Sequence, residues 1–337
     1  MYKNNQTTIT EVILLGFQSS RETSIVLFIL LLIVYILTLF GNLLIITLVY
    51  YHKTLHTPMY FFLIQLSLSD ILLTTDIAPN LLHTLLHGGG TMSFTGCIFQ
   101  QYVFDVMEAA ECLLLTVMSY DRYLAICNPL HYSYLMSEVF CINLTIFTWL
   151  LSIGSMLIST ITIASLDFCG PNIIDHFFCD FSPVVKLSCS DTFLVELEIT
   201  FYSIPFILLP FFIITISYTY IIFTILKIPS NTGKQKVFST CSSHLLVVCL
   251  FYGTLIVIYV SPTSGQSLTI HKLLSLVYTV GTPLMNPIIY SLRNRDIKMA
   301  FAKAWQTITR DETQRLVMSL RSRLQAGIDC KGFATKY

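Results

Sequence analysis

Seven long apolar stretches constrain this chain more than any other feature of its sequence. Each has about 20 residues or more, the length that an α-helix needs to cross the roughly 30 Å hydrocarbon core of a bilayer. Only 11% of the residues are charged and the mean hydropathy is +0.72, whereas soluble domains carry about 25% charged residues. The predicted fold is an all-α membrane protein, a seven-transmembrane helix bundle with spans at 24–50, 58–83, 98–127, 140–165, 197–226, 238–260 and 270–291.

The segment after the last span is typical of a short amphipathic helix on the membrane surface. It reads SLRNRDIKMAFAKAW, in which Ile297 and Phe301 share one side with two alanines. Its lysines and arginines can reach lipid headgroups, so membrane lipid is an expected partner. The predicted domains are an N-terminal segment at 1–23, the helix bundle at 24–291, the amphipathic helix at 292–306 and a flexible tail at 307–337.

Lysine and arginine are distributed unevenly between the two sides of the predicted bundle. With residue 1 outside, the inner loops and the tail hold 15 of the 19, and the outer segments hold 4. Because positive charge favours the cytoplasmic side, we expect a multi-pass membrane protein with an extracellular N-terminus and a cytoplasmic tail. Asn5 begins an Asn-Gln-Thr triplet, the acceptor for N-glycosylation at such an end. Four cysteines fall on the outer side, where disulfides persist, and allow three pairings: Cys97, Cys169, Cys179 and Cys189.

The third span carries more acids than a lipid-facing helix can hold. Asp105, Glu108 and Glu111 lie within it, and a carboxylate at mid-bilayer costs about 2.5–3.5 kcal/mol. We therefore expect this helix to lie inside the bundle. Asp70 of the second span is a further acid at this depth, and two such carboxylates repel unless one is protonated or a cation lies between them.

The sequence lacks the motifs of several other classes of protein. It contains no glycine-rich phosphate loop, zinc-finger spacing or G-x-S-x-G elbow, so we expect no enzyme activity. The net charge of zero gives no ground for a nucleic-acid partner. Acids inside a membrane leave a transporter or an ion-translocating protein as the alternative function, although no paired internal repeats support it. A retinal-type photoreceptor would need a lysine in the last span, and 273–292 contains none.

Six motifs occur along the chain: LHTPMYFFLIQLSLSD (55–70), MSYDRYLAIC (118–127), HFFCD (176–180), SY (217–218), KVFSTCSSH (236–244) and PLMNPIIY (283–290). Together they resemble the odorant receptors, a family of rhodopsin-like G protein-coupled receptors. The similarity covers about residues 1–306, with Ser119 and Val237 where alanine is usual and a reversed Leu284-Met285 order. It implies a receptor of the plasma membrane that binds a small odorant and activates a heterotrimeric G protein, in this family the stimulatory olfactory type, which raises cyclic AMP.

The resemblance implies one of the three cysteine pairings. Cys97 would bond Cys179 and so attach the third span to the long outer loop, and Cys169 would bond Cys189 within that loop. Closing long loops in this way contributes a few kcal/mol, on the order of the values measured for other disulfides. The HFFCD stretch, which starts at His176, could also be interpreted as a metal site. Against this, a Cys179 in a disulfide cannot serve as a thiolate ligand.

The same resemblance implies a sodium site at mid-bundle. Asp70 and Glu111 would form it, with Asn286 nearby; hard oxygen ligands suit this ion. The alternative is a protonated, hydrogen-bonded pair of carboxyl groups. We expect no cofactor other than this structural ion. Pro287 follows Asn286 and should kink the seventh span, which would let its inner end move.

An activation switch is implied at the inner end of the third span. Asp121 and Arg122 are adjacent and can pair in a resting state, with Tyr123 completing the motif. In the family the equivalent arginine meets the G protein after this pair breaks, and two tyrosines swing toward it, here Tyr218 and Tyr290. Asn286 and Pro287 belong to the same switch. The alternative is an interfacial salt bridge that only anchors the helix.

The resemblance places the ligand cavity between the outer halves of the third, fifth, sixth and seventh spans. An apolar cavity with a few polar groups suits a small, mostly hydrophobic molecule. For each single residue, helix packing is the alternative to ligand contact. The matching positions are Phe104, Asp105, Glu108, Ala109, Tyr202, Ser203, Phe206, Tyr252, Leu255, Ile256, Tyr259, Leu276 and Thr279.

Asp105 and Glu108 distinguish this chain, because most odorant receptors lack acids at these positions. They are three residues apart and hence on neighbouring turns of one helix. We hypothesise that the ligand carries a positive or hydrogen-bond-donating group, such as an amine. The alternative is that the acids are protonated or bonded to neighbouring helices.

Overall fold

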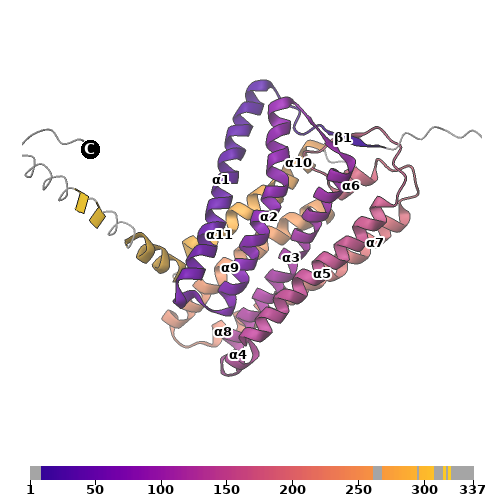
Figure 1. Cartoon of the computed structure of the whole chain (residues 1–337). Coiled ribbons are helices and arrows are strands. Elements are labelled where there is room, and N and C mark those ends of the chain that lie inside the picture. Colours follow the sequence, from indigo (N-terminus) through magenta and orange to yellow (C-terminus); the bar gives the residue numbers. More distant parts are fainter. Residues whose placement is uncertain (1–8, 261–267, 294–295, 307–313, 316–317, 320–337) are drawn as a thin grey trace, which may run out of the picture. The chain divides into compact units, whose positions relative to one another are not determined.

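The computed structural model describes residues 9–260, 268–293, 296–306, 314–315 and 318–319. Helices occupy all seven ranges in which spans are predicted, within these residues (Figure 1). Two of the spans are composite, because a π-helical segment joins two α-helices. The elements are α1 (Arg21–Tyr51), α2 (Pro58–His87), α3 (Phe94–Cys127), α5 (Glu138–Ala164), α7 (Phe193–Ser203) with η2 (Ile204–Leu208) and α8 (Leu209–Lys227), α9 (Asn231–Val260), and α10 (Leu268–Leu276) with η3 (Val277–Gly281) and α11 (Thr282–Arg293).

Short elements connect these helices and form a small sheet. A 3₁₀ turn links α1 to α2, one short helix precedes α5, and another lies in the long loop before α7. Residues 296–306 are also helical and belong to a separate unit, 295–337. The short elements are η1 (Lys53–Leu55), α4 (Pro129–Leu135), α6 (Phe181–Val185) and the strands β1 (Glu11–Leu14), β2 (Gly90–Ser93) and β3 (Ile173–Ile174).

Local signals in the sequence set the ends of α2 and α3. Pro58 is the first residue of α2, where its missing N–H has no helical partner to lose. The helix ends at Gly88, whose φ of 70° is a left-handed conformation that glycine adopts without strain. The Ser93 hydroxyl caps α3 by accepting from the Gly96 amide at 3.1 Å. These caps place both helix ends beside the outer loops.

The helices divide into lipid-facing and enclosed ones. Among the described residues, five helical segments are long and apolar enough to cross a membrane, and α1 and α5 are the least buried of the continuous ones. The acid-bearing helix α3 is not one of the five, because every apolar stretch of it that is long enough to span carries more than two charged residues. It packs against α2, α5, α8 and α9. The prediction that this helix lies inside the bundle is therefore confirmed.

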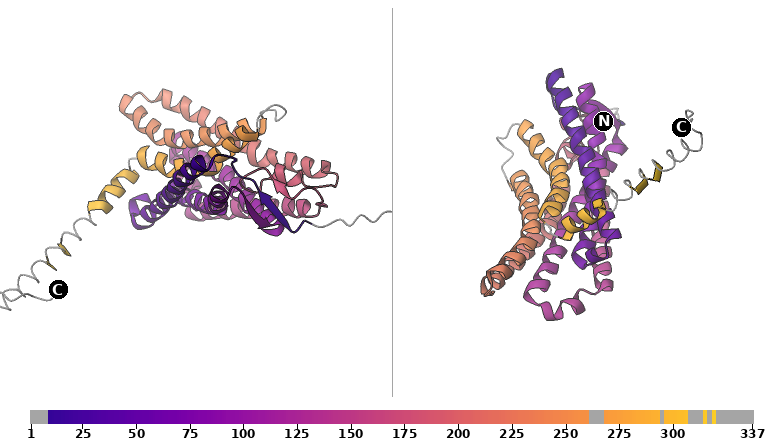
Figure 2. Two further views of the ribbon diagram at one scale, coloured as in Figure 1. Left: turned by 90° about the horizontal axis from the view of Figure 1, so that it is seen from above. Right: turned by 90° about the vertical axis from the view of Figure 1, so that its left-hand side faces the viewer.

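A three-stranded sheet covers the outer end of the bundle. The strand β1 pairs antiparallel with β2 and parallel with β3, so the strand order is β2-β1-β3. Figure 1 shows β1 at the end where α1 begins and α2 ends, and Figure 2 shows α1 beside α2 in a second direction. The sheet joins the N-terminal segment to two outer loops. We call residues 11–17 together with 172–177 the outer cap.

Candidate functional site

Two disulfides hold the long outer loop. Cys97 of α3 bonds Cys179, with the two Cα atoms 5.4 Å apart, and Cys169 bonds Cys189, with 5.8 Å between the Cα atoms. The Cys179 amide also donates to Gln100 Oε1 at 3.0 Å. The structure thus contains the two pairings that the family resemblance implied, and it places the loop directly against the outer end of α3.

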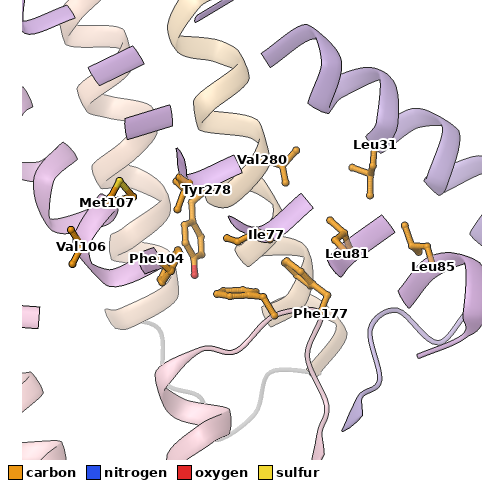
Figure 3. Close-up of a cluster of buried hydrophobic side chains, with 12 residues drawn as sticks. Leu31, Ile77, Leu81, Leu85, Phe104, Val106, Met107, Phe177, Tyr278 and Val280 are labelled. Carbon is orange, nitrogen blue, oxygen red and sulfur yellow. The ribbon is translucent and has the colours of Figure 1, made fainter. Parts of the chain in front are cut away.

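Aromatic side chains fill the space between this loop and the helices. The Phe104 ring of α3 lies 5.1 Å from the ring of Phe178 and 5.8 Å from that of Tyr278 in η3. Phe177 stacks on Phe17 of the N-terminal segment at 5.5 Å. Figure 3 shows Phe104, Tyr278 and Phe177 in one cluster with Ile77 of α2. The predicted ligand residue Phe104 is therefore at a junction of α3, the loop and the seventh span.

The structure brings some predicted ligand residues into the bundle core. Tyr252 is buried, and its hydroxyl is 3.5 Å from the Cys112 carbonyl of α3. Phe206 lies in η2 and Thr279 in η3, and both are buried. Ala109 and Leu255 are buried, whereas Tyr202 and Leu276 are half-buried. The side chains of Ser203, Ile256 and Tyr259 lie outside the described part of the structure, as does Asn5.

The two π-helical segments are features that the sequence analysis missed. Such segments are frequent at functional sites. One contains Phe206 and the other Tyr278 and Thr279. Pro205 within η2 and Gly281 at the end of η3 are the only local signals for them, and neither residue type predicts a π-helix by itself.

The acids of the outer half form a group of three. Asp105 and Glu108 are half-buried on α3, and Asp180 of the loop is close enough to repel both electrostatically. Glu108 Oε1 is buried and lacks a hydrogen-bond partner among the described residues. Burial raises the pKa of Asp180, while the Phe181 amide, which donates at 2.8 Å, and His271 oppose this rise. Asp180 was part of a motif but not a predicted ligand residue.

His176 is enclosed by aromatic rings rather than by metal ligands. Its ring lies 4.6 Å from that of Phe177 and 4.7 Å from that of Phe178. Burial, together with the nearby His271 and Lys272, lowers its pKa from 6.5 to about 3, so the ring is neutral at pH 7. No group of three metal-ligating side chains occurs within the described residues. The disulfide of Cys179 also removes the thiolate that the metal alternative required.

A latch connects the outer cap to the seventh span. The Lys272 ammonium of α10 donates to the Gly16 carbonyl at 2.8 Å and to the Asp175 carboxylate at 2.5 Å. Lys272 is only 6% exposed. The Gly16 amide in turn donates to the His176 carbonyl at 3.0 Å. One cation therefore holds the N-terminal segment and the long loop together, which the sequence did not predict.

The mid-bundle acids are close together, as predicted. Asp70 is fully buried, and Asn286 Nδ2 donates to both of its carboxylate oxygens, at 3.0 and 3.1 Å. The Glu111 carboxyl contacts that of Asp70, and Glu111 Oε1 has no hydrogen-bond partner among the described residues. Asn42 Nδ2 donates to the Pro283 carbonyl at 3.1 Å and so attaches α1 to this region. The possible ligands are buried carboxyl oxygens, which fit a hard monovalent cation.

Asp121 is the centre of the polar network at the inner end. It accepts hydrogen bonds from Arg122, and from the Tyr132 hydroxyl of α4 at 2.7 Å. Asp121 is fully buried. Burial raises the pKa of Tyr132, and the charge of Asp121 raises it further. The predicted Asp121–Arg122 pair is present, and Tyr132 is a third member that the sequence analysis missed.

The two switch tyrosines have different surroundings. The Tyr218 hydroxyl is 2.6 Å from His244 Nδ1, and the two rings stack at 5.7 Å. Tyr290 is fully buried, and its hydroxyl has no hydrogen-bond partner among the described residues. Tyr123 packs against Tyr220, with 6.0 Å between the rings. His244 belongs to a motif that the sequence analysis quoted, but its role as the partner of Tyr218 required the structure.

A cavity of about 480 Å³ lies away from all predicted ligand residues. It is at the inner ends of α1, α2 and α5, and Val49, Leu55, Phe61, Met136 and Ile142 are among the residues that line it. The acids and aromatic residues of the candidate ligand site are on the opposite, outer side. This cavity is therefore separate from the candidate ligand site.

Two comparisons with known sequences point to one family, and a solved structure has a similar fold. A family model described as "Olfactory receptor" matches residues 31–307. The chain is 47% identical to human "Olfactory receptor 10A7", over 94% of this chain and 99% of that protein, and 45% identical to rat "Olfactory receptor 1496", over 89% and 97%. Squid rhodopsin has a similar fold, with a TM-score of 0.68 at 18% identity, over 87% of this chain and 88% of that one.

Proposed function

Since the chain belongs to the olfactory receptor family, we propose that it is an odorant receptor that binds a small, mostly hydrophobic ligand in the outer half of the bundle and activates a heterotrimeric G protein. The family consists of signalling receptors, which confirms the prediction that the chain is not an enzyme. The rhodopsin-like fold likewise favours a receptor over the transporter alternative.

The observation that carries this proposal is the placement of polar groups along α3. Its outer part contacts the loop through Cys97 and Phe104. Its middle contributes Glu111 to the acid pair, and its inner end holds the Asp121–Arg122 pair. A ligand with unequal affinity for two packings of this helix would shift the equilibrium between them. One element thus connects recognition with the G protein face.

We propose an amine or a similar hydrogen-bond donor as the polar group of the ligand. Asp105 and Glu108 take no part in the ion pairs found in the described part of the chain, which involve Arg122 and Lys272. Asp180 adds a third carboxyl group to theirs. A ligand cation would reduce the repulsion among the three, and the surrounding aromatic rings would hold its apolar part.

Asp70 and Glu111 would hold a sodium ion, with Asn286 beside them. The ion would supply positive charge between two buried carboxyl groups. The full burial of Asp70 supports this proposal, as does a Glu111 oxygen that lacks a hydrogen-bond partner among the described residues. The alternative is a protonated pair, in which the two carboxyl groups are hydrogen-bonded to each other and Asn286 donates to both Asp70 oxygens.

At the inner end we propose that activation breaks the hydrogen bonds of Asp121. Arg122 would then contact the G protein, and Tyr218 and Tyr290 would move toward it. Tyr218 must leave His244 for this, so that hydrogen bond belongs to the resting packing. Pro287 lies inside α11, and the backbone hydrogen bond that a proline removes would give the inner end of the helix the freedom that this movement requires.

The remaining parts of the proposal concern the cell. The receptor is placed in the plasma membrane with its N-terminus outside and Asn5 glycosylated. The helix at 296–306 contacts membrane lipid, and the G protein is the stimulatory olfactory type. The multi-pass character itself follows from the family and the apolar helices.

A cyclic AMP assay tests the function. Cells that express the receptor with the stimulatory olfactory G protein are exposed to an odorant panel that contains amines and their neutral isosteres. We expect a dose-dependent rise in cyclic AMP for some members of the panel, which should disappear in Arg122→Ala at equal surface level. A substrate flux that needs no ligand, without any cyclic AMP response, would contradict the receptor function.

A further inference from the structure

The outer end of α2 carries two histidines with metal-ligand spacing. His83 and His87 are four residues apart, and their rings stack with 4.3 Å between centroids and 24° between planes. Residues at this spacing share one face of a helix, which is how helical His-x-x-x-His pairs bind zinc. We propose that His83 and His87 form a binding site for a divalent transition metal ion, copper or zinc, that lies outside the ligand site and the switch.

The hydrogen bond of His87 leaves its Nε2 atom free to bind a metal ion. His87 Nδ1 is 3.0 Å from the His83 carbonyl oxygen. Because a carbonyl only accepts, Nδ1 carries the hydrogen and Nε2 keeps its lone pair. A metal-binding histidine usually donates its other ring N–H to a carbonyl or carboxylate in the same manner, which fixes the ring and its tautomer.

The His83 ring is oriented by a glycine. A β-carbon at Gly90 would lie 3.1 Å from His83 Nδ1, so this edge of the ring faces the backbone of β2 and the Nε2 edge faces away from it. Both rings are on exposed residues. Binding would require both side chains to rotate from the stacked arrangement until the two Nε2 atoms lie at the usual Zn–N distance of about 2.0–2.1 Å from one ion.

The helix end gives the pair a fixed frame. Thr84 accepts hydrogen bonds from the amides of both Gly88 and Gly89, the second at 3.1 Å, and so closes the last turn. Gly89 has a φ of 148°, which turns the chain directly into β2. The glycines leave the histidines without side-chain neighbours from this turn, so the ion can approach from solvent.

The coordination of such an ion would be open. No third histidine, cysteine or acid completes a cluster here within the described residues, so water fills the remaining positions. Imidazole ligands suit copper, zinc and nickel, and copper binds most tightly among divalent ions of this series. An ion with two protein ligands is exchangeable, which fits a modulating site better than a structural one.

Metal binding should also stabilise the outer cap. Thr84 contacts Gly16, since a β-carbon on Gly16 would lie 2.9 Å from the threonine hydroxyl. Gly16 is hydrogen-bonded to both the long loop and Lys272. An ion that binds only the folded receptor raises its unfolding temperature by mass action.

Copper titration of the purified full-length receptor in nanodiscs tests the proposal. Electron paramagnetic resonance should show one copper ion with two imidazole nitrogens, and copper should raise the unfolding temperature. His83→Gln and His87→Gln should each weaken binding about tenfold or more, since even the loss of a group that orients a ligand costs about that much. Both variants should keep the metal-free unfolding temperature, because the two rings are exposed.

His56→Gln is the matched control, because His56 is an exposed histidine beside η1 at the other end of the bundle. It should leave the two-nitrogen signal and the copper affinity unchanged. A signal that survives in the double variant of His83 and His87, or that disappears in the His56 variant, would overturn the proposal. Failure of the odorant assay would leave this outcome unaffected, since the metal alone is the probe.

Discussion

The inner and outer halves of the bundle differ in the hydrogen-bond partners of their acids. At the inner end Asp121 accepts from Arg122 and Tyr132, and Tyr218 is bonded to His244. At the outer end Glu108 has an oxygen without a partner among the described residues, although covalent bonds hold the loop above it. The acid at the inner end is thus partnered by hydrogen bonds that can be exchanged, although the Tyr290 hydroxyl there has no partner among the described residues. In the outer half, by contrast, an acid keeps an unpartnered oxygen below a loop that a disulfide holds.

This difference indicates where each half can respond. A buried polar atom without a partner is costly unless something supplies one. A ligand can do so at the outer acids, while the inner network loses nothing until its own partners move. Substitutions in the two halves should therefore have different signatures.

The largest effect is expected from the outer frame. Cys97→Ala removes the disulfide to Cys179, which joins residues 82 positions apart. Loss of a native disulfide costs about 2–5 kcal/mol in small secreted domains, so we expect the receptor to disappear from the cell surface, as measured by flow cytometry. Cys249→Ala, at an exposed free cysteine, should be silent. A normal surface level of Cys97→Ala would show that the frame does not depend on this bond.

The inner network should respond through basal activity rather than folding. Asp121→Asn weakens the hold on Arg122, whose side chain is only 13% exposed. A loss of about 1.4 kcal/mol of resting-state stabilisation raises the active fraction about tenfold. Cyclic AMP without ligand should rise accordingly at equal surface level. Unchanged basal signalling would favour the alternative that the pair only anchors the helix.

The outer cap should lose stability in acid. The pKa of His176 is lowered from 6.5 to about 3 on folding, so the unfolded chain takes up a proton at a higher pH than the folded one. Stability is present above about pH 6.5 and is lost as the pH falls toward 3. His176→Gln should flatten the dependence of the unfolding temperature on pH between about 7 and 5, which is the upper part of this window. His131→Gln is the control, because this exposed histidine lies in α4 at the inner end.

The smallest effect is expected at the latch. Lys272→Met removes the ion pair with Asp175, a residue with a 44% exposed side chain, and such pairs contribute about 0–1 kcal/mol. We expect a few-fold change at most in ligand potency, on the order of what 1 kcal/mol produces. Lys186→Met, at an exposed lysine of the same loop, should have no effect. A loss of all response in Lys272→Met would mean that ligand binding depends on the attachment of the outer cap far more than the energy of one ion pair accounts for.

The sequence predicted the helices well because the bilayer demands a fixed length of apolar chain. It also predicted that α3 lies inside, because its acids cannot face lipid. It did not predict the sheet, since β1 has four residues, Glu11–Leu14, and is paired only through tertiary contacts. The partners Tyr132, His244 and Lys272 were missed for the same reason. His244 and Lys272 are 26 and 97 residues from Tyr218 and Asp175, and Tyr132 is separated from Asp121 by the end of α3 and the turn into α4, so only packing brings these groups together.

The outer acids are proposed to bind a cationic group of the ligand. The dose–response of an activating amine and of its neutral isostere, on the wild type and on Asp105→Asn, tests this directly. We expect the amine to lose potency by about tenfold or more in the variant, as for the loss of a charged partner in a buried site, while the response to the isostere is unchanged. Equal responses of the wild type to both compounds, together with a silent Asp105→Asn, would contradict it.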